Sequence, residues 1–253
     1  MAPRAGFCFG VKRALDIALS SLETGQDDVY TYGSLIHNRQ VVDKLARLGL
    51  KTTEDPRDIT TGKVIIRSHG VGPKTLELIK GKGLDIIDAT CPFVKKAQTI
   101  AHRLDREGFQ VIVVGDKEHP EVKGIVEWTG NRAIVIKDPQ EVQALPVFPK
   151  IGVLAQTTLD YSTFEEVTGR LRQKTRELQI HNTICSATKI RQEEAFRLAQ
   201  TVDVMIVIGG KHSANTKKLA SICQRAGTLT FQIEEASELE PHWFTNAKRV
   251  GVT

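Results

Sequence analysis

Short apolar runs alternate with amphipathic stretches along the chain. Residues 111–114 (VIVV) and 204–208 (VMIVI) are two such runs, and each is followed directly by glycine. Continuous apolar runs of this kind are typical of strands buried on both faces, whereas apolar residues spaced three to four apart are typical of helices. Strands that alternate with helices predict parallel sheets with right-handed crossovers. The pattern therefore predicts an α/β fold.

This pattern occurs three times. Each copy opens with a cysteine at a predicted helix start, followed by basic residues about four positions later and by apolar residues at helical spacing. The three cysteines are Cys8 in CFGVKRAL, Cys91 in CPFVKKAQ and Cys185 in CSATKIRQ. Pro92 suits the first turn of a helix, where its missing N–H does no harm.

Each of these helices is followed by a strand, a glycine turn and a histidine, and then by a second helix and further strands. The histidines are His37, His119 and His212, which lie 27 to 29 residues after the cysteine of the same copy. Three copies of this pattern predict three small α/β modules, with boundaries at residues 1–89, 90–183 and 184–253. The third copy stops where its last strand ends, so we expect this module to be C-terminally incomplete.

The cysteines, glycine turns and histidines all fall at the carboxyl ends of predicted strands. Parallel sheets bind their ligands at this edge. Three modules related by a pseudo-threefold axis would point these ends at one centre. The sequence thus predicts a trefoil of three α/β modules around a common site.

Composition narrows the possible partners. The net charge of +5 and the pI of about 9.0 suit an anionic ligand or an acidic protein, and no dense basic run with interleaved aromatics indicates nucleic acid. No G-x-x-x-x-G-K-[ST] motif indicates a nucleotide-hydrolysing loop. The apolar runs are too short to cross a membrane and no signal segment precedes the first helix, so we expect a cytoplasmic bacterial protein.

Three cysteines that meet at one point need a cation, because thiolates repel one another. Zinc and an iron–sulfur cluster are both candidates. Three cysteines on a [4Fe–4S] cluster leave one iron without a protein ligand, and helix N-termini would stabilise the negative charge of the cluster. A single cysteine is more often a buried apolar residue, which is our expectation for Cys223, since it has no counterpart in the other copies.

Neutral and protonatable donors gather at the same predicted edge. His37, His69 and His119 follow strands, and Ser213 and Asn215 open a helix whose N–H groups point outward. Such a set suits a phosphate or diphosphate. Glu121 is the carboxylate in the middle of these donors. Its pKa should rise beside an anionic ligand and an anionic cluster, which would make it a proton donor.

The motifs GFCFGVKRAL, GSLIHN, RSHGV, DATCPFVKK, EHPEVKG, AQTTL, TICSATKIRQ and GGKHSANT resemble the LytB/IspH family of 4-hydroxy-3-methylbut-2-enyl diphosphate reductases, from Gly6 to Thr253. The resemblance implies reductive removal of the allylic hydroxyl of that diphosphate, which gives isopentenyl and dimethylallyl diphosphate in the last step of the non-mevalonate pathway. It also implies a trefoil fold and a ferredoxin or flavodoxin as electron donor.

The resemblance further implies roles for particular residues. Cys8, Cys91 and Cys185 would bind a [4Fe–4S] cluster. The diphosphate would be bound by His37, His69, His119, Ser213 and Asn215. Glu121 would deliver protons, Thr157 would contact the substrate hydroxyl, and both would be catalytic residues together with His119. Two positions differ from the family pattern: Ala214 stands where serine is common and His212 where asparagine is common. The family continues after GVT with an Ala-Gly-Ala-Ser loop that the sequence does not include.

Two other readings are open from the sequence. One is an enzyme like quinolinate synthase, whose architecture is similar: three α/β modules around a three-cysteine cluster. Its substrate is closer to a dicarboxylate, whereas the histidine and hydroxyl donors here favour a diphosphate. The other alternative is a non-catalytic iron–sulfur protein, which would have no need of Glu121 and Thr157 beside an open iron.

Overall fold

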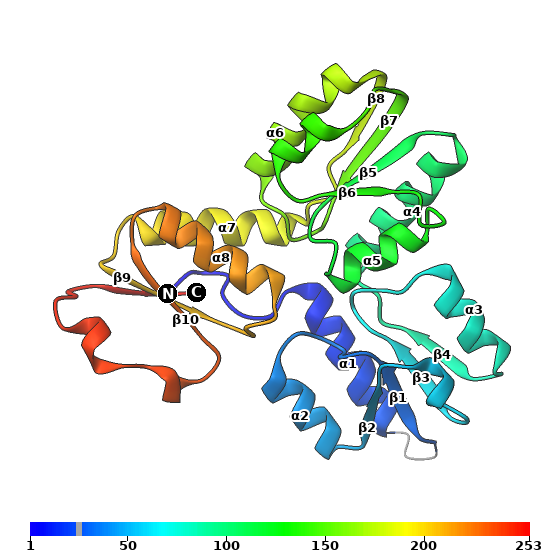
Figure 1. Cartoon of the computed structure of the whole chain (residues 1–253). Helices are drawn as coiled ribbons and strands as arrows, with labels where there is room; N and C mark the ends of the chain where they lie inside the picture. The colour runs from blue at the N-terminus through cyan, green and yellow to red at the C-terminus, as the bar shows by residue number, and fades with distance from the viewer. Residues whose placement is uncertain (24–26) are drawn as a thin grey trace. The chain divides into compact units, whose positions relative to one another are not determined.

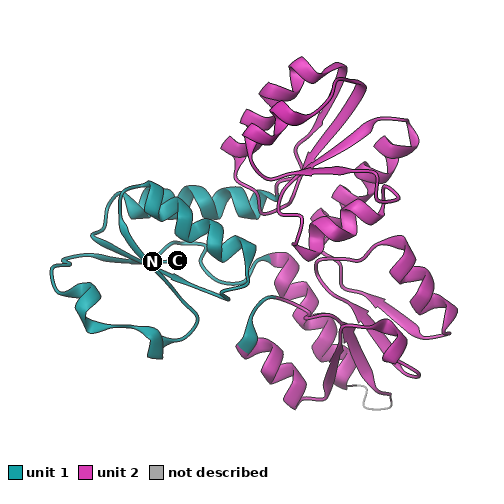
Figure 2. Ribbon diagram, viewed as in Figure 1, with its two compact units in different colours: residues 1–8, 37–39, 185–253 teal, residues 9–36, 40–184 magenta. Residues whose placement is uncertain are grey.

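The computed structural model describes residues 1–23 and 27–253, which form an α/β protein with parallel sheets (Figure 1). The chain divides into two compact units, shown in Figure 2. Unit 1 comprises residues 1–8, 37–39 and 185–253, and unit 2 comprises residues 9–36 and 40–184. Unit 2 contains two of the three sheets, and unit 1 contains the third.

The first sheet of unit 2 has four parallel strands in the order β2-β1-β3-β4. They are β1 (Val29–Tyr32), β2 (Leu50–Thr53), β3 (Lys63–Ile66) and β4 (Asp85–Asp88), with helices α1 (Phe9–Glu23), α2 (Arg39–Arg47) and α3 (Pro73–Gly81). The β-branched residues Val64, Ile65 and Ile66 of the central strand β3 are almost fully buried. Small residues of α1, Ala14 and Ala18, pack against one face of this sheet and so allow close approach of the helix.

The second sheet of unit 2 has the same topology, in the order β6-β5-β7-β8. Its strands are β5 (Gln110–Val114), β6 (Ile134–Ile136), β7 (Phe148–Ala155) and β8 (Thr175–His181), with helices α4 (Pro92–Arg106), α5 (Pro120–Glu127) and α6 (Tyr161–Leu171). Helices α4 and α5 lie on one side of this sheet and α6 on the other (Figure 1). Separate apolar clusters fill the two faces, one with α4 and α5 and the other with α6. Burial on both faces explains why residues 111–114 of β5 and the end of β7 carry no polar side chain.

The sheet of unit 1 has one strand fewer, in the order β10-β9-β11. It consists of β9 (Val204–Ile208), β10 (Leu229–Ile233) and β11 (Val250–Val252), with helices α7 (Ser186–Ala199) and α8 (Ala214–Arg225). One face packs against α7 and α8, and the other is covered by Trp243, whose ring stacks on Phe231 at 3.9 Å. The N-terminal segment belongs to this unit, since the Ala2 N–H donates to the carbonyl of Val252.

Short 3₁₀ helices complete the described chain: Pro56–Asp58, Pro139–Ala144, Arg172–Lys174, Ala236–Glu238 and Pro241–Phe244. No helix among residues 1–23 and 27–253 combines the length and the hydropathy that a membrane-crossing segment requires.

The structure confirms the predicted α/β class and the three parallel sheets. Cys223 lies in the core, as expected, and burial raises the pKa of its thiol to about 11. Pro92 occupies the first turn of α4, also as expected. Basic residues at the starts of α1 and α4 form contacts with the chain just before α4. The Arg13 guanidinium donates to the carbonyls of Thr90 and Asp88, and Lys95 forms an ion pair with Asp88.

Candidate functional site

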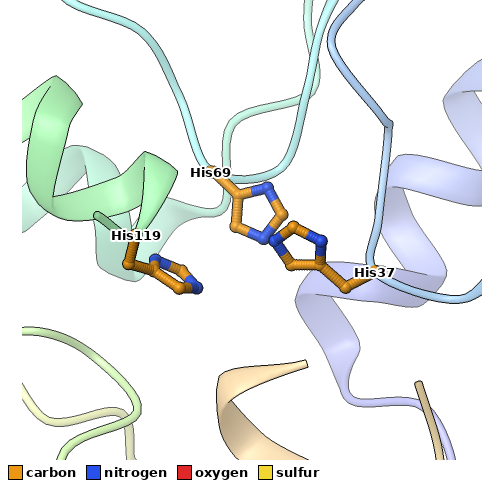
Figure 3. A group of neighbouring side chains, drawn as sticks. All are labelled: His37, His69 and His119. Atoms are coloured by element: carbon orange, nitrogen blue, oxygen red, sulfur yellow. The ribbon is translucent and has the colours of Figure 1, made fainter. Parts of the chain in front are cut away.

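His69 and His119 lie together in unit 2, although they follow strands of different sheets. Their ring centroids are 5.4 Å apart and the rings meet edge to face (Figure 3). His69 sits in the loop after β3, where Gly70 has a φ of +68° and turns the chain. His119 ends the loop after β5 and is the N-cap of α5. The structure therefore brings these two predicted residues side by side.

The capping role of His119 fixes which of its ring nitrogens carries a proton. Its Nδ1 accepts a hydrogen bond from the N–H of Glu121 at 3.2 Å. An accepting Nδ1 is unprotonated, so the neutral ring carries its proton on Nε2. His119 can thus offer an N–H donor to an anion without being charged.

Glu121 and Thr157 form a buried pair. One carboxyl oxygen of Glu121 accepts from the N–H of Thr157 at 2.7 Å, and the other is bonded to the Thr157 hydroxyl at 2.8 Å. Glu121 is 2% exposed, and this burial raises its pKa to about 7, although the two bonds from Thr157 oppose the rise. The expected direction of the pKa shift is confirmed, but its cause in the described protein is burial. A carboxyl group with this pKa can hold and release a proton near neutral pH.

The loop after β7 is held by Gln156, which is 4% exposed. Its amide oxygen accepts from the N–H of Asp116, and its amide nitrogen donates to the hydroxyl of Thr158. A Cβ at Gly115 would lie 2.8 Å from the Gln156 side chain, so only glycine fits there. These contacts tie the loops after β5 and β7 together and so place Thr157 against Glu121.

The three predicted ligand cysteines all stand where a helix begins. Cys91 and Cys185 are the N-caps of α4 and α7, and Cys8 directly precedes α1. All three are partly exposed, and neither the Cys91 nor the Cys185 thiol caps its own helix. The positive end of a helix dipole favours a thiolate over a thiol. The Cys91 N–H donates to the carbonyl of Ser68, the residue before His69.

In unit 1, the predicted anion-binding residues lie at the start of α8. Ser213 is the N-cap, and its hydroxyl oxygen accepts from the N–H of Thr216 at 3.3 Å. That hydroxyl keeps its own proton to donate. Asn215 is partly buried in the first turn, and His212 just before the cap is exposed. His37 also belongs to unit 1, and its carbonyl packs so closely on Gly210 that a Cβ there would lie 2.2 Å away.

Three residues near His69 were not anticipated from the sequence. Gln98 of α4 and Trp128 at the end of α5 both donate to the carbonyl of Val71 in the His69 loop. Arg67 lies over the ring of Tyr32 at 5.6 Å, and desolvation lowers the pKa of its guanidinium. Arg67 could have been identified from the sequence, because it stands two residues before His69. Gln98 and Trp128 could not, since their partner is a backbone carbonyl.

A cavity of about 460 Å³ lies at the opposite edge of the second sheet, near Phe109, Phe148 and Lys150. Its cations are already engaged: Arg132 pairs with Asp105, and Lys150 donates to the carbonyl of Glu107. The residues that line this cavity include no histidine and no cysteine, unlike those at the carboxyl edge of the sheet.

Comparisons with known proteins agree with this picture. The chain matches the LytB protein family over residues 1–253. It is 47% identical over 253 residues to the 4-hydroxy-3-methylbut-2-enyl diphosphate reductase of Geobacter metallireducens, covering 100% of this chain and 89% of the relative. The enzyme of the same name from Pelobacter propionicus is 46% identical over 254 residues, covering 100% of this chain and 90% of the relative.

Two solved structures are also similar. One is (E)-4-hydroxy-3-methyl-but-2-enyl diphosphate reductase, described as the terminal enzyme of the non-mevalonate pathway. It has a TM-score of 0.73 and 43% identity, over 100% of this chain and 91% of that one. The other is the E-1-hydroxy-2-methyl-but-2-enyl-4-diphosphate reductase of Plasmodium falciparum. Its TM-score is 0.95 and its identity 28%, over 99% of this chain and 80% of that one.

Proposed function

Because the chain belongs to the LytB family, we propose that it is a reductase of 4-hydroxy-3-methylbut-2-enyl diphosphate, at the terminal step of the non-mevalonate pathway. In this reaction the allylic C–O bond breaks, two electrons and two protons are taken up, and water leaves. The products are isopentenyl and dimethylallyl diphosphate. The observation that carries the proposal is the buried Glu121–Thr157 pair, a proton donor with a pKa of about 7 at the carboxyl edge of the sheet.

The electrons need a redox group, and the donor set fits a [4Fe–4S] cluster. Cys8, Cys91 and Cys185 offer partly exposed thiols at helix starts, whereas Cys223 is buried in a core and does not qualify. A cluster on these cysteines would supply electrons and one iron without a protein ligand. The protein contributes the helix ends, whose dipoles stabilise the negative charge there.

The diphosphate would be bound by imidazole, hydroxyl and amide donors. The Nε2–H of His119 and the ring of His69 provide imidazole donors in unit 2. His37, the hydroxyl of Ser213 and the amide of Asn215 provide donors in unit 1. Neutral and cationic donors of this kind bind phosphate oxygens well, and the N-terminus of α8 adds backbone N–H groups.

Glu121 would hold the proton that the leaving hydroxyl and the carbon need. Its burial keeps the carboxyl protonated near neutral pH, and the bond to the Thr157 hydroxyl leads the proton to a side chain that can itself reach the substrate hydroxyl. Thr157 thus orients the substrate and passes the proton on, while Glu121 is the source.

For the electron donor we propose a ferredoxin or flavodoxin that docks beside Cys91. The starts of α1 and α4 meet there through the bonds of Arg13. Lys12 of α1 and Lys96 of α4 are exposed, and Phe9 is 62% exposed. A cationic face with one apolar side chain suits the acidic surface of a small electron carrier.

The test is anaerobic purification followed by iron and sulfide analysis and an assay with reduced methyl viologen. The proposal expects about four irons and four sulfides and formation of both five-carbon diphosphates. Protein with a full cluster and no turnover would instead support a non-catalytic iron–sulfur protein. Binding of a dicarboxylate in place of the diphosphate would support an activity of the quinolinate synthase type.

A further inference from the structure

The loop that carries His69 is hydrogen-bonded to α5, the helix that carries His119. The carbonyl of Val71, two residues after His69, accepts from the indole N–H of Trp128 at 3.1 Å. Trp128 is the C-cap of α5, and His119 is its N-cap. One short helix therefore positions one imidazole at its start and grips the loop of the other at its end.

A second donor reaches the same carbonyl from α4. The Gln98 amide nitrogen lies 3.4 Å from the Val71 carbonyl oxygen, and Gln98 is only 6% exposed. Glycines make room for this amide. A Cβ on Gly70 would lie 2.6 Å from its nitrogen, and a Cβ on Gly124 would lie 3.3 Å away. The loop and α5 both lack side chains where Gln98 passes between them.

Two further contacts stiffen the arrangement. The carbonyl of Trp128 is bonded to His102 at 3.0 Å, and the rings of these two residues meet edge to face. Glu127 packs on the next loop residue, where a Cβ on Gly72 would lie 2.3 Å from its own Cβ. The indole therefore has little freedom to move away from Val71.

From this geometry we infer that Trp128 and Gln98 are positioning residues that set His69 against His119 for binding the diphosphate. The inference rests on the proposed function. A phosphate oxygen shared by two imidazoles requires their separation to be fixed before binding, since ordering the loop on binding would cost affinity. We call the two hydrogen bonds from Trp128 and Gln98 to the Val71 carbonyl the clamp. Because the clamp acts through the backbone of the loop, it sets the position of His69 without contact to the ligand.

Replacing Trp128 with phenylalanine tests the clamp with the smallest change. The aromatic ring stays, and the hydrogen bond to Val71 is lost. The Kd for inorganic pyrophosphate and the KM for substrate should both rise about 2- to 12-fold, the value of one hydrogen bond. Cluster content and kcat should stay within about twofold of the wild type, because neither Glu121 nor a cysteine is touched. Gln98→Met, which keeps the length and removes the donor, should change affinity in the same direction.

A double-mutant cycle separates positioning from general loosening. If the clamp acts through His69, then Trp128→Phe in a His69→Ala background should cost no further pyrophosphate affinity. Equal losses with and without His69 would overturn the inference, as would an unchanged Kd in both single variants. Trp243→Phe is the matched control, since that indole stacks on Phe231 in unit 1. Turnover by the wild type tests the proposed function independently of these differences.

Discussion

Helices α5 and α8 begin at equivalent points of the repeat, yet they offer different chemistry. Each follows a glycine turn and starts at a side-chain N-cap, His119 for α5 and Ser213 for α8. Two residues after its cap, α5 carries Glu121, which is 2% exposed. The same position of α8 is Asn215, which is partly buried and has no charge. One helix start therefore holds a proton, and the other offers neutral donors.

The difference shows how a repeated module can specialise without changing its fold. Both caps are satisfied by backbone N–H groups of their own helix, so the local structure is preserved in each. The chemistry then depends on a single side chain in the first turn and on what covers it. At α5 the cover is the loop after β7, which supplies both bonds from Thr157.

The largest effect is expected at the cysteines. Cys8→Ser, Cys91→Ser or Cys185→Ser should each lose the cluster and, with it, all reductase activity, because a hydroxyl is a poor ligand for iron in such a cluster. Iron and sulfide analysis of anaerobically prepared protein measures the loss.

Cys223→Ser is the control, since this thiol lies inside α8 with its sulfur 3.8 Å from the carbonyl of Ala195. It should keep the cluster. Full cluster content in the three helix-start variants would contradict the assignment of these cysteines as ligands.

The next largest effect is expected at Glu121. The amide of Glu121→Gln keeps the shape and the bond to the Thr157 N–H, but it cannot supply a proton. We expect kcat to fall at least about 100-fold, the usual value of general acid catalysis, while substrate still binds and perturbs the cluster spectrum.

Glu118→Gln provides a matched carboxylate three residues earlier. Glu118 is exposed and pairs with Lys123, so its loss should leave kcat unchanged. A Glu121→Gln enzyme with a kcat near that of the wild type would remove Glu121 from the proton path.

These two sites differ in how far the sequence could predict them. The cysteines were predictable because helical spacing begins directly after each one, which places them at helix starts in any α/β fold. Glu121 was predictable as a candidate from its place beside His119. Its two bonds to Thr157 were not, since they depend on how two loops of the second sheet pack together. The clamp on Val71 was also hidden, because a backbone carbonyl accepts from any donor and leaves no pattern in the sequence.

The neutral helix start should affect binding more than chemistry. Asn215→Ala removes a donor from the first turn of α8, so we expect KM to rise about 5- to 150-fold if a bond to a charged phosphate oxygen is lost, with little change in kcat. Steady-state kinetics separates the two constants.

Ser237→Ala is a suitable comparison, because its hydroxyl faces Glu235 at an exposed position in the same unit. Its KM should match that of the wild type. An unchanged KM in Asn215→Ala would mean that α8 does not contact the diphosphate.

The pH dependence tests the buried carboxyl directly. Burial raises the pKa of Glu121 from 4.5 to about 7, so the protonated form dominates below that pH and is depleted above it. A proton donor must be protonated to act. The value of kcat/KM should therefore fall about tenfold per pH unit above pH 7. A flat profile between pH 7 and 9 would show that another group supplies the proton.

The last comparison weakens the cover of Glu121 rather than the carboxyl itself. Its readout is a small shift in the position of the pH profile, separate from the loss of turnover expected when Thr157 is removed from the proposed proton path. The two bonds from Thr157 favour the ionised form and lower the pKa, in opposition to burial. Thr157→Val removes the hydroxyl bond and keeps the bond from the backbone N–H. The ionised form then loses part of its stabilisation, so the pKa of Glu121 should rise and the alkaline limb of kcat/KM should move to higher pH. Thr168→Val is the control, because that hydroxyl is bonded to the carbonyl of Glu165 within α6 and not to Glu121. Since KM also changes if Thr157 contacts the substrate, the position of the limb is the quantity to compare, not its height. A limb that moves to lower pH would mean that the Thr157 hydroxyl does not stabilise the ionised carboxylate.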